Sequence, residues 1–389
     1  MPAINRFGEF HEEITGWRRD FHSNPELLYD VERTAGKVEE LLKSFGVDEI
    51  VTGIGKSGVV GVIKGKNNNS SRVVGLRADM DALPIKEATG KEYASKIDGK
   101  MHACGHDGHT AMLLGAAKYL AETRNFDGTA IVIFQPAEEG GAGGKAMVDD
   151  GMMERFGIEQ VFGMHNMPRL PLGQFAIREG GMMAATDEFT ITINGVGGHA
   201  AMPHMSIDPV MIAAQITVAL QTLVSRNVDP IDNAVLTVTQ IHGGAAYNVI
   251  PGSAQIMGTI RTLNENVRRQ MEKRLGEMVE KIADAFGARA DLKFKRGYPV
   301  MSNAGEQTRF AVEVASELVG AENVNDNVAP VMGGEDFAYM AIARPGAFIF
   351  IGNGDSADLH QDTYDFNDEV IPLGCSYWVK LVENALPVS

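Results

Sequence analysis

Apolar residues in the first part of the chain follow two spacings, one typical of helices and one typical of buried strands. Helical spacing runs from Glu12 to Phe45, with an interruption at Asn24-Pro25, and returns over Thr110–Thr123. Short apolar segments predict strands at Gly58–Lys64, Arg72–Leu76, Ala130–Phe134, Gln160–Met164 and Ala347–Ile351. Strands that alternate with helices predict an α/β fold, a mostly parallel sheet with helices on both faces.

A different pattern covers residues 187–297. Phe189, Ile191 and Ile193 alternate with polar neighbours, which predicts a strand with one buried face. A helix, two strands, a helix and a strand follow at Asp208–Arg226, Ala234–Ile241, Ala254–Leu263, Asn264–Phe286 and Asp291–Lys295. This order is ferredoxin-like. We therefore predict a smaller α+β domain at 187–297, inserted into a larger domain formed by 1–186 and 298–389.

Composition and charge narrow the class of protein. The 389 residues exceed what one hydrophobic core usually supports, which agrees with two domains. The net charge is -16 and Lys and Arg form no cluster, so we expect neither nucleic acid nor membrane as a partner. The chain has no apolar run long enough to span a bilayer, and its first residues do not resemble a secretion signal. Two cysteines fit a reducing cytoplasm.

Candidate metal ligands are concentrated in the eight residues His102–His109, which contain three histidines and Cys104. Glu138-Glu139, His165 and His360 follow further along the chain. Thiol and imidazole groups suit zinc, cobalt, nickel or manganese better than calcium or magnesium. The alternative is that Cys104 is a small buried hydrophobic residue and the glutamates are solvated. The combination of distant segments favours a metal centre.

The predicted strands add a second argument. Asp79 and the Glu138-Glu139 pair each follow a predicted strand. His165 follows another directly, and His360 follows the last one after a short loop. Open α/β sheets place their sites beyond the carboxyl ends of their strands, so we expect these side chains to meet there.

Local spacing indicates how these residues divide their functions. Cys104 and His106 are two positions apart, so in extended backbone their side chains point to the same side and reach one metal or two neighbouring metals. Glu138 and Glu139 are adjacent, so at a strand end they point apart. We assign Glu139 as a ligand and Glu138 as the general base that takes a proton from a metal-bound water and returns it to a leaving amine.

Two glycine-rich segments do not match nucleotide-binding motifs. Gly140–Lys145 lacks the first glycine and the final Ser or Thr of a phosphate loop, and Gly195–His199 opens no helix. In the inserted domain, His199 is a candidate donor to an oxyanion and Arg261 a candidate clamp for a carboxylate, with a surface position as the alternative for each. The remaining histidines are interpreted as having no catalytic function: His11, His22, His204 and His242.

Several motifs together resemble one enzyme family. They are LRADMDALP at 76–84, the His102–His109 segment, FQPAEEG at 134–140, GMHN at 163–166, GHA at 198–200, YNVIP at 247–251, GEDF at 334–337 and the segment around His360. Along nearly its whole length the chain resembles the N-acyl-amino-acid amidohydrolases. This branch of the metal-dependent aminoacylase and carboxypeptidase superfamily includes hippurate hydrolase and indole-acetyl-amino-acid hydrolases.

The resemblance implies two divalent metal ions, zinc or manganese, with cobalt and nickel as alternatives. It implies Glu138 as the catalytic base and the following ligands: Cys104, His106, Glu139, His165 and His360. The resemblance also implies that residues 1–186 and 298–389 form the metal-binding catalytic domain.

The resemblance also assigns a function to the inserted domain. This domain is expected to act as a lid, to dimerise in many relatives, and to contact the substrate through His199, Asn248 and Arg261. Other branches have a metal-binding histidine where this chain has Arg77. Because an arginine cannot ligate a metal, Asp79 keeps at most an orienting function in catalysis.

We therefore expect a metal-dependent hydrolase that cleaves the amide bond of small N-acyl amino acids, with N-benzoylglycine (hippurate) favoured. Glu138 activates the water, His199 supports the oxyanion and Arg261 holds the carboxylate. An aminoacylase, N-acetyl-amino-acid deacetylase or dipeptidase of the same superfamily is the first alternative. A catalytically silent metal-binding protein and a regulatory ligand-binding module are the others. The expected assembly is a homodimer or tetramer formed through the lid.

Overall fold

The computed structural model describes residues 3–66 and 69–388, which form two compact units. Unit 1 comprises Met1–Gly180, Ser302–Ala329 and Asp336–Ser389, and unit 2 comprises Gly181–Met301 and Pro330–Glu335. Met1 and Pro2, part of the segment searched for a secretion signal, lie outside the described residues. Within the described ranges, none of the helices has the length and apolar composition needed to cross a bilayer.

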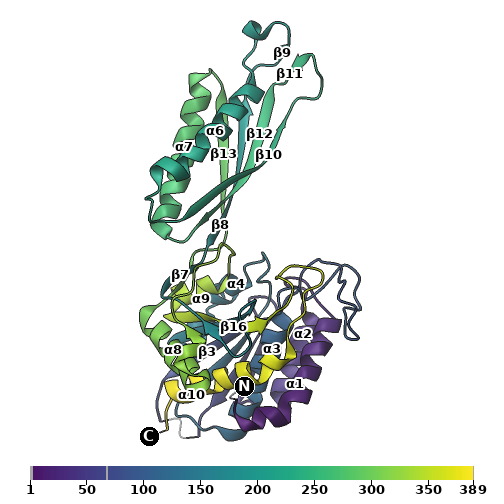
Figure 1. The fold of residues 1–389 in the computed structure, drawn as a ribbon, viewed down its shortest axis with the longest axis vertical. Coiled ribbons are helices and arrows are strands. Elements are labelled where there is room, and N and C mark those ends of the chain that lie inside the picture. Colours follow the sequence, from purple (N-terminus) through teal and green to yellow (C-terminus); the bar gives the residue numbers. More distant parts are fainter. Residues whose placement is uncertain (1–2, 67–68, 389) are drawn as a thin grey trace. The chain divides into compact units, whose positions relative to one another are not determined.

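Unit 1 is built on an eight-stranded sheet (Figure 1). In spatial order the strands are β1 (Glu49–Ile54), β2 (Gly58–Lys64), β4 (Thr129–Gln135), β3 (Val73–Asp79), β5 (Gln160–Pro168), β16 (Gly346–Gly354), β6 (Phe175–Ala176) and β15 (Val324–Asn325). Its central strands β4, β3, β5 and β16 run parallel, whereas β1 and β2 are antiparallel to their neighbours. The predicted, mostly parallel sheet is confirmed.

Helices flank this sheet and bury its apolar strands. They are α1 (Asn5–Ser23), α2 (Glu32–Ser44), α3 (His106–Thr123), α4 (Gly143–Asp149), α5 (Met152–Arg155), α8 (Gly305–Val319), η2 (Ala321–Asn323), α9 (Phe337–Ala343), η3 (Asp368–Val370) and α10 (Ile371–Ala385). Helix α3 packs against α1 and α10, and α4 packs against α9. Because α3 is covered on nearly all sides, its first turn, where the predicted ligands begin, is held inside unit 1.

Unit 2 has its own antiparallel sheet and its own core. Its elements are β8 (Ala185–Asn194), β9 (Gly198–His199), η1 (Pro203–Met205), α6 (Pro209–Asn227), β10 (Ala234–Gly243), β11 (Val249–Ile250), β12 (Ser253–Thr262), α7 (Glu265–Ala285) and β13 (Arg289–Arg296). Two short paired strands, β7 (Gly180–Met183) and β14 (Met301–Asn303), include residues of both units. The sheet order is β10-β12-β8-β13, and α6 and α7 pack together against it (Figure 1). The ferredoxin-like order β8-α6-β10-β12-α7-β13 is as predicted.

Four strands of unit 1, β3, β4, β5 and β16, extend further than the sequence pattern predicted, and two of these extensions change the position of site residues. β3 ends at Asp79 rather than Leu76, and β5 continues to Pro168 rather than ending at Met164. β5 continues because β16 pairs with it in parallel as far as Pro168. Asp79 is therefore the last residue of a strand and His165 lies inside one, so the expectation that both follow their strands is wrong.

Candidate metal centre

The loop that carries Cys104 leads directly into α3 through a glycine. Gly105 has φ +92°, a left-handed conformation, and a Cβ at this position would lie 2.2 Å from Asn166 Oδ1 and 2.7 Å from Tyr364 Oη. Only glycine fits both the conformation and the space. His106 is consequently the first residue of a helix, and the expected extended segment is replaced by this turn.

The five predicted metal ligands meet in unit 1. Cys104 Sγ lies 3.4 Å from His165 Nε2. Glu139 Oε1 lies 3.4 Å from His360 Nε2 and 3.9 Å from His106 Nε2. In each of three sets, candidate ligand atoms lie within 4.8 Å of one another: Cys104, His106 and His165; Cys104, Glu139 and His360; His106, Glu138 and Glu139. Since the sets share members, the side chains form one connected cluster.

His360 enters the cluster from an exposed loop that follows β16. Its backbone N–H donates to the Ala103 carbonyl at 2.8 Å, which fixes this loop beside Cys104. The His360 side chain is 53% exposed, whereas those of the other four candidate ligands are buried or nearly so. The cluster therefore opens toward solvent at His360.

Backbone carbonyls orient two of the imidazoles. His106 Nδ1 donates to the Asp81 carbonyl at 2.8 Å, and His165 Nδ1 donates to the Asn166 carbonyl at 2.7 Å. In the neutral form each imidazole carries one N–H, so Nε2 keeps its lone pair for a ligand. Burial lowers the pKa of His106, but the nearby acids Asp79, Asp81 and Glu139 outweigh it and raise this pKa to about 10, so a bound cation would take the place of the Nε2 proton. His106 Nε2 and Glu139 Oε1 are buried without a hydrogen-bond partner among the residues that the structure describes. Two orphaned ligand atoms beside a thiol fit a bound divalent cation.

The electrostatics of the cluster also fit a cation. Burial, and then the carboxylates of Glu139 and Glu138, raise the pKa of the Cys104 thiol well above its ordinary value. Burial likewise holds the pKa of His165 well below its ordinary value. A bound ion such as zinc would reverse this preference for the protonated thiol, because coordination by a metal favours the thiolate.

Glu138 and Glu139 lie on a tight turn after β4. Asp81 accepts both of their backbone N–H groups, at 2.9 Å and 3.1 Å. Ala137 has a left-handed φ of +56°, so the strand geometry ends before the pair. Their carboxylates both approach His106, and the expectation that they point apart is wrong. Asp81 was not predicted, although its position two residues after Asp79 was the available signal.

Both carboxylate oxygens of Asp79 are engaged. Oδ1 accepts from His109 Nδ1 at 2.6 Å, and Oδ2 accepts from Arg77 at 2.7 Å. His109 Nε2 in turn contacts Asn166, whose backbone N–H lies 3.0 Å away. His109, the third histidine of the segment, is therefore held between Asp79 and Asn166. This arrangement supports an orienting function for Asp79, which lies 3.6 Å from His106 Nε2.

The three predicted substrate residues all lie in unit 2. His199 pairs with Val249 in the short β9–β11 ladder, and the Asn248 carbonyl accepts from Ala200, so His199 and Asn248 are neighbours. Both are exposed.

Arg261 lies elsewhere in the same unit. It sits on β12 opposite Thr186, whereas Ser253, at the other end of β12, pairs with Asn194 near the β9–β11 ladder. Eight residues of strand correspond to about 26 Å at roughly 3.3 Å per residue. The fold of unit 2 therefore separates Arg261 from His199 and Asn248.

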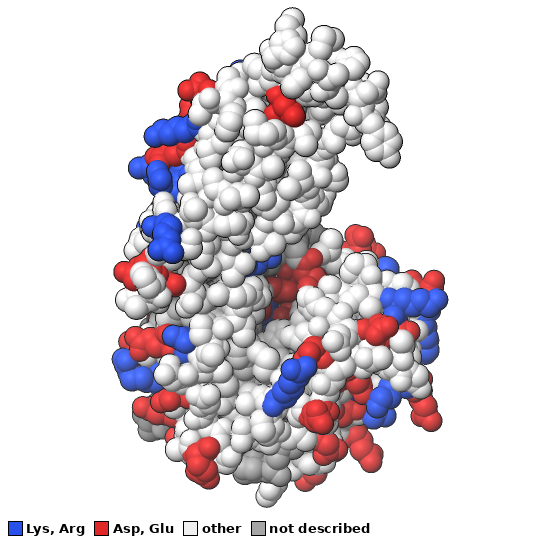
Figure 2. Space-filling view, turned by 45° about the horizontal axis from the view of Figure 1, so that its top comes forward, with Lys and Arg blue, Asp and Glu red and all other residues white. Residues whose placement is uncertain are grey.

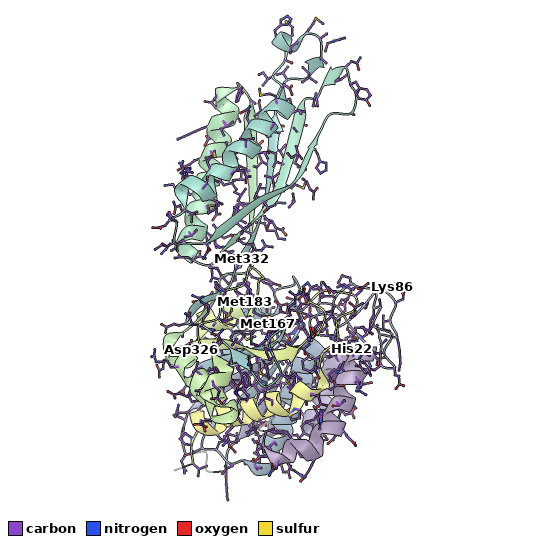
Figure 3. All side chains as sticks on the ribbon, viewed as in Figure 1. His22, Lys86, Met167, Met183, Asp326 and Met332 are labelled. Carbon is purple, nitrogen blue, oxygen red and sulfur yellow. The ribbon has the colours of Figure 1, made fainter. Side chains whose placement is uncertain are left out.

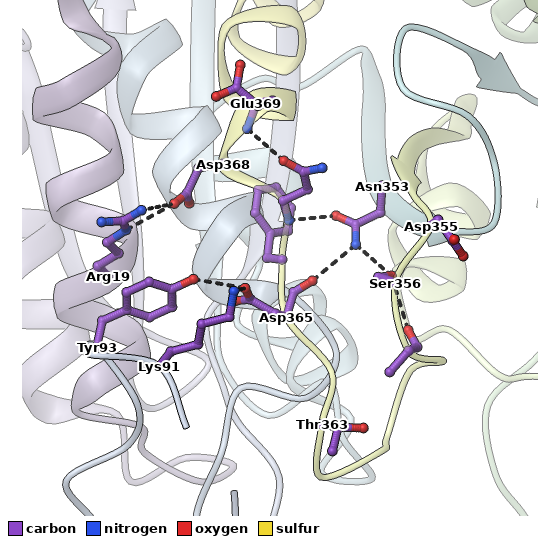
Figure 4. Close-up of a pocket in the computed structure, with 13 residues that line it drawn as sticks. Arg19, Lys91, Tyr93, Asn353, Asp355, Ser356, Thr363, Asp365, Asp368 and Glu369 are labelled. Atoms are coloured by element: carbon purple, nitrogen blue, oxygen red, sulfur yellow. Dashed lines mark hydrogen bonds and ion pairs between the residues drawn. The ribbon is translucent and has the colours of Figure 1, made fainter. Parts of the chain in front are cut away.

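A polar pocket of about 500 Å³ lies elsewhere in unit 1 (Figure 4). Its two cationic side chains are already paired, Arg19 with Asp368 at 2.9 Å and Lys91 with Asp365 at 3.1 Å. The predicted site residues are not among those lining it. The metal-ligand cluster is thus a separate feature.

Residues 75–384 match the sequence profile of the peptidase family M20/M25/M40. The chain belongs to this family. This M20-family chain is 44% identical over 381 residues to hippurate hydrolase of Campylobacter jejuni, with 98% of each chain covered. It is 38% identical to N-acetylcysteine deacetylase of Bacillus subtilis, with 96% of each covered. The crystal structure of the Bacillus subtilis YXEP protein, a dinuclear metal binding peptidase, matches with a TM-score of 0.86 and 34% identity, covering 97% of this chain and 99% of that one.

Proposed function

We propose that this protein is a metal-dependent amidohydrolase of N-acyl amino acids, with N-benzoylglycine (hippurate) as the favoured substrate. The observation that carries the proposal is one cluster of side chains in unit 1, in which Glu138, our proposed base, lies with five candidate ligands: Cys104, His106, Glu139, His165 and His360. Family membership and the 44% identity to a hippurate hydrolase support the reaction and the acyl group. The likeness to N-acetylcysteine deacetylase makes N-acetyl amino acids the first alternative.

We propose that the cluster holds two divalent ions, zinc or manganese, with cobalt and nickel as alternatives. The likeness to a dinuclear metal binding peptidase supports this number. When bound, such ions polarise the substrate carbonyl and lower the pKa of water. Because the Cys104 thiol must stay reduced to serve as a ligand, we also propose a cytoplasmic location.

The side chains of the protein carry the proton transfers and hold the substrate. Glu138 takes the proton from the attacking water and delivers it to the leaving nitrogen. His199 donates to the oxyanion that develops on the carbonyl oxygen. Arg261 holds the free carboxylate of the substrate in a bidentate contact. Asn248, which neighbours His199, is the other side chain proposed to contact the substrate. Asp79 orients the imidazoles of the cluster.

The separation within unit 2 supports a dimer in which two chains build each site. A hippurate-sized molecule cannot span about 26 Å, so it cannot contact Arg261 and His199 of the same chain. We propose that the partner's His199 and the partner's Asn248 complete the site that contains Arg261.

The surface of unit 2 supports association through this unit. The outer side of α6 and the edge strand β10 expose Val210, Met211, Val218, Val235 and Ile241. The only charged residue of α6 is Arg226, whereas α7 is rich in charges, and on the face shown in Figure 2 much of unit 2 is uncharged. Apolar surface of this kind is typical of an interface.

Metal analysis paired with a substrate panel tests the proposal. Purified protein is assayed for amine release from N-benzoyl, N-acetyl and indole-acetyl amino acids, with hydrolysis of N-benzoylglycine expected to be fastest. Glu138→Ala is expected to abolish turnover while the metal content stays near normal. Normal turnover in that variant would remove Glu138 from the mechanism. Absence of metal-dependent hydrolysis across the panel would contradict the function.

Mixing two inactive variants tests whether the partner's His199 completes the site. Glu138→Ala and His199→Ala chains are each expected to be inactive as homodimers. In a hybrid dimer, one site combines an intact Glu138 with the intact imidazole of the other chain, so activity returns. Hybrids that stay inactive would place His199 in the site of its own chain.

A further inference from the structure

The turn that presents Glu138 and Glu139 has an unusual backbone. Three of its residues adopt left-handed φ values: Ala137 at +56°, Gly140 at +93° and Ala142 at +55°. Alanine rarely adopts this conformation, and such residues persist where surrounding contacts determine the path of the chain. The contacts that hold the two ends of this turn therefore decide where the two carboxylates lie.

One carboxylate, that of Asp336, holds both ends of the turn. Asp336 Oδ1 accepts from the side chain of Gln135, the last residue of β4, at 2.7 Å. Asp336 Oδ2 accepts the backbone N–H of Gly144, in the first turn of α4, at 2.7 Å. A Cβ on Gly144 would approach the Asp336 backbone oxygen to 2.8 Å, so glycine is needed for this closeness. Residues 136–143 lie between these two anchoring points.

Arg77 supplies the opposite charge and links this anchor to the metal-ligand cluster. Its guanidinium donates to Gln135 at 2.8 Å, to Asp336 Oδ1 at 3.1 Å and to Asp79 Oδ2 at 2.7 Å. All four side chains are fully buried. A guanidinium stays charged and directs its donors in a rigid plane, so these three acceptors are fixed relative to one another.

Stability alone is a weak explanation for this buried group of charges. The cost of removing ions from water offsets much of their attraction, and apolar residues of similar volume stabilise a core equally well. The positions of its partners distinguish this group. Asp336 accepts from the last residue of β4 and from the first turn of α4. Arg77 donates to the Asp79 carboxylate, which contacts His109.

We propose that Asp336 and Arg77 are positioning residues for the two glutamates. They hold both ends of the 136–143 turn, so that the Glu138 carboxylate stays within reach of the reacting water and Glu139 stays within reach of its metal. This inference rests on the proposed function, in which Glu138 is the base. Carboxylate oxygens of Asp336 and Glu138 also lie within 4.8 Å of one another, so Asp336 is next to the side chain that it positions.

Asp336→Asn is the primary test, because the amide has nearly the same shape but only one acceptor oxygen. It cannot accept from both Gln135 and Gly144, and its NH2 group faces a donor. We expect kcat to fall about 100-fold, the effect of a displacement near 1 Å, with KM within about threefold of the original. Bound metal per chain and the midpoint of thermal unfolding are measured on the same samples, and two metals are expected to remain bound.

Arg77→Lys is the second variant, since it keeps the charge but loses the planar set of donors. We expect the same pattern, a lower kcat with nearly unchanged KM and metal content. Asp368→Asn is the matched control, because Asp368 pairs with the buried Arg18 at 2.7 Å in the same unit and does not contact the turn. It is expected to lower the thermal midpoint while kcat changes by less than about threefold.

The outcomes separate this proposal from the proposed function. If Asp336→Asn and Arg77→Lys keep kcat within threefold while Glu138→Ala is inactive, the function stands and the positioning role is overturned. Loss of both fold and metal in the two variants also overturns it, because that result identifies a purely structural pair. Normal turnover by Glu138→Ala would instead refute the mechanism on which the proposal rests.

Discussion

His22 on α1, labelled in Figure 3, is a fully buried imidazole that bridges two carboxylates. Its Nδ1 lies 2.8 Å from Asp107 and its Nε2 lies 3.3 Å from Glu87. Burial lowers the pKa of an imidazole, but the hydrogen bonds to these acids outweigh it and raise the pKa of His22 to about 9. The charged ring therefore stabilises the fold fully below pH 6.5, and this stabilisation is lost as the pH rises through about 9.

We predict that His22→Gln lowers the free energy of unfolding by on the order of 3 kcal/mol at pH 6 and by much less at pH 10. Urea unfolding of both proteins at the two pH values measures this difference. His204→Gln, at an exposed position, serves as the control and should change neither value. A loss of equal size at both pH values would contradict the assigned cause.

The two cysteines offer a matched pair of substitutions. Cys104 belongs to the ligand cluster, whereas Cys375 is buried between α10 and α3, where its thiol donates to the Met112 carbonyl at 3.2 Å. Cys104→Ala is expected to lose bound metal and activity. Cys375→Ala is expected to keep both and to lose roughly 1–2 kcal/mol of stability from its small cavity. Metal content after dialysis distinguishes the two, and equal retention of metal would exclude Cys104 as a ligand.

The sequence predicted the candidate ligands themselves better than the residues whose hydrogen bonds keep those ligands in position. Cys104, Glu139 and their partners have side chains whose chemistry itself indicates metal binding. Asp81 and Asp336 were not predicted, because they act on backbone N–H groups of segments 57 and 192 residues away. No spacing of side chains reveals which distant backbone group a carboxylate accepts.

At the scale of single elements, apolar spacing located the strands but not all of their ends. β2 was predicted with its observed bounds, because polar residues flank its apolar run. β5 was predicted too short, because its last part is held by pairing with β16, almost two hundred residues away in the chain. That extension places His165 within a strand and aims its ring at Cys104.

The start of α3 depends on Gly105, and substitution there tests this dependence. Gly105→Ala is expected to displace Cys104 and His106, because its Cβ would lie 2.2 Å from Asn166 Oδ1. We predict at least about a tenfold loss of metal affinity, because a ligand held in the wrong orientation binds its metal more weakly. Gly90→Ala is the control, since Gly90 has φ +67° but nothing within 4 Å of its Cβ position.

Isothermal titration with zinc measures both variants. Gly90→Ala places an alanine in the left-handed conformation but creates no close contact like that with Asn166. It should therefore bind zinc as the original protein does. If both variants lose affinity equally, backbone strain explains the effect and the close contact with Asn166 does not.

At the scale of the whole molecule, most of unit 2 is one continuous segment, Gly181–Met301, to which Pro330–Glu335 is added. Within that segment β8 and β13 are neighbouring antiparallel strands, and Asp187 on β8 pairs with Arg296 on β13. The apolar core of unit 2 is formed by β8, β10, β12, α6 and α7 within this insertion. Unit 2 therefore has an apolar core of its own.

This pairing permits residues 187–296, the larger part of unit 2, to be removed as one piece. We predict that replacing residues 187–296 by a two-residue Asn-Gly turn between Thr186 and Gly297 yields a folded unit 1, because paired strand ends are close enough for a hairpin. All five candidate ligands stay in the shortened chain, so metal binding should be retained. Turnover should be lost, since His199, Asn248 and Arg261 are absent.

Metal titration and the N-benzoylglycine assay, run on the same shortened protein, distinguish the contributions of the two units. Retained metal with activity reduced by more than about a thousandfold would locate ligation in unit 1 and substrate stabilisation in unit 2. Substantial activity without the insertion would show that the metal-ligand cluster and Glu138 suffice, and Arg261 and His199 would lose their proposed functions. Loss of metal together with activity would mean that unit 2 is needed to keep the ligands of unit 1 in place.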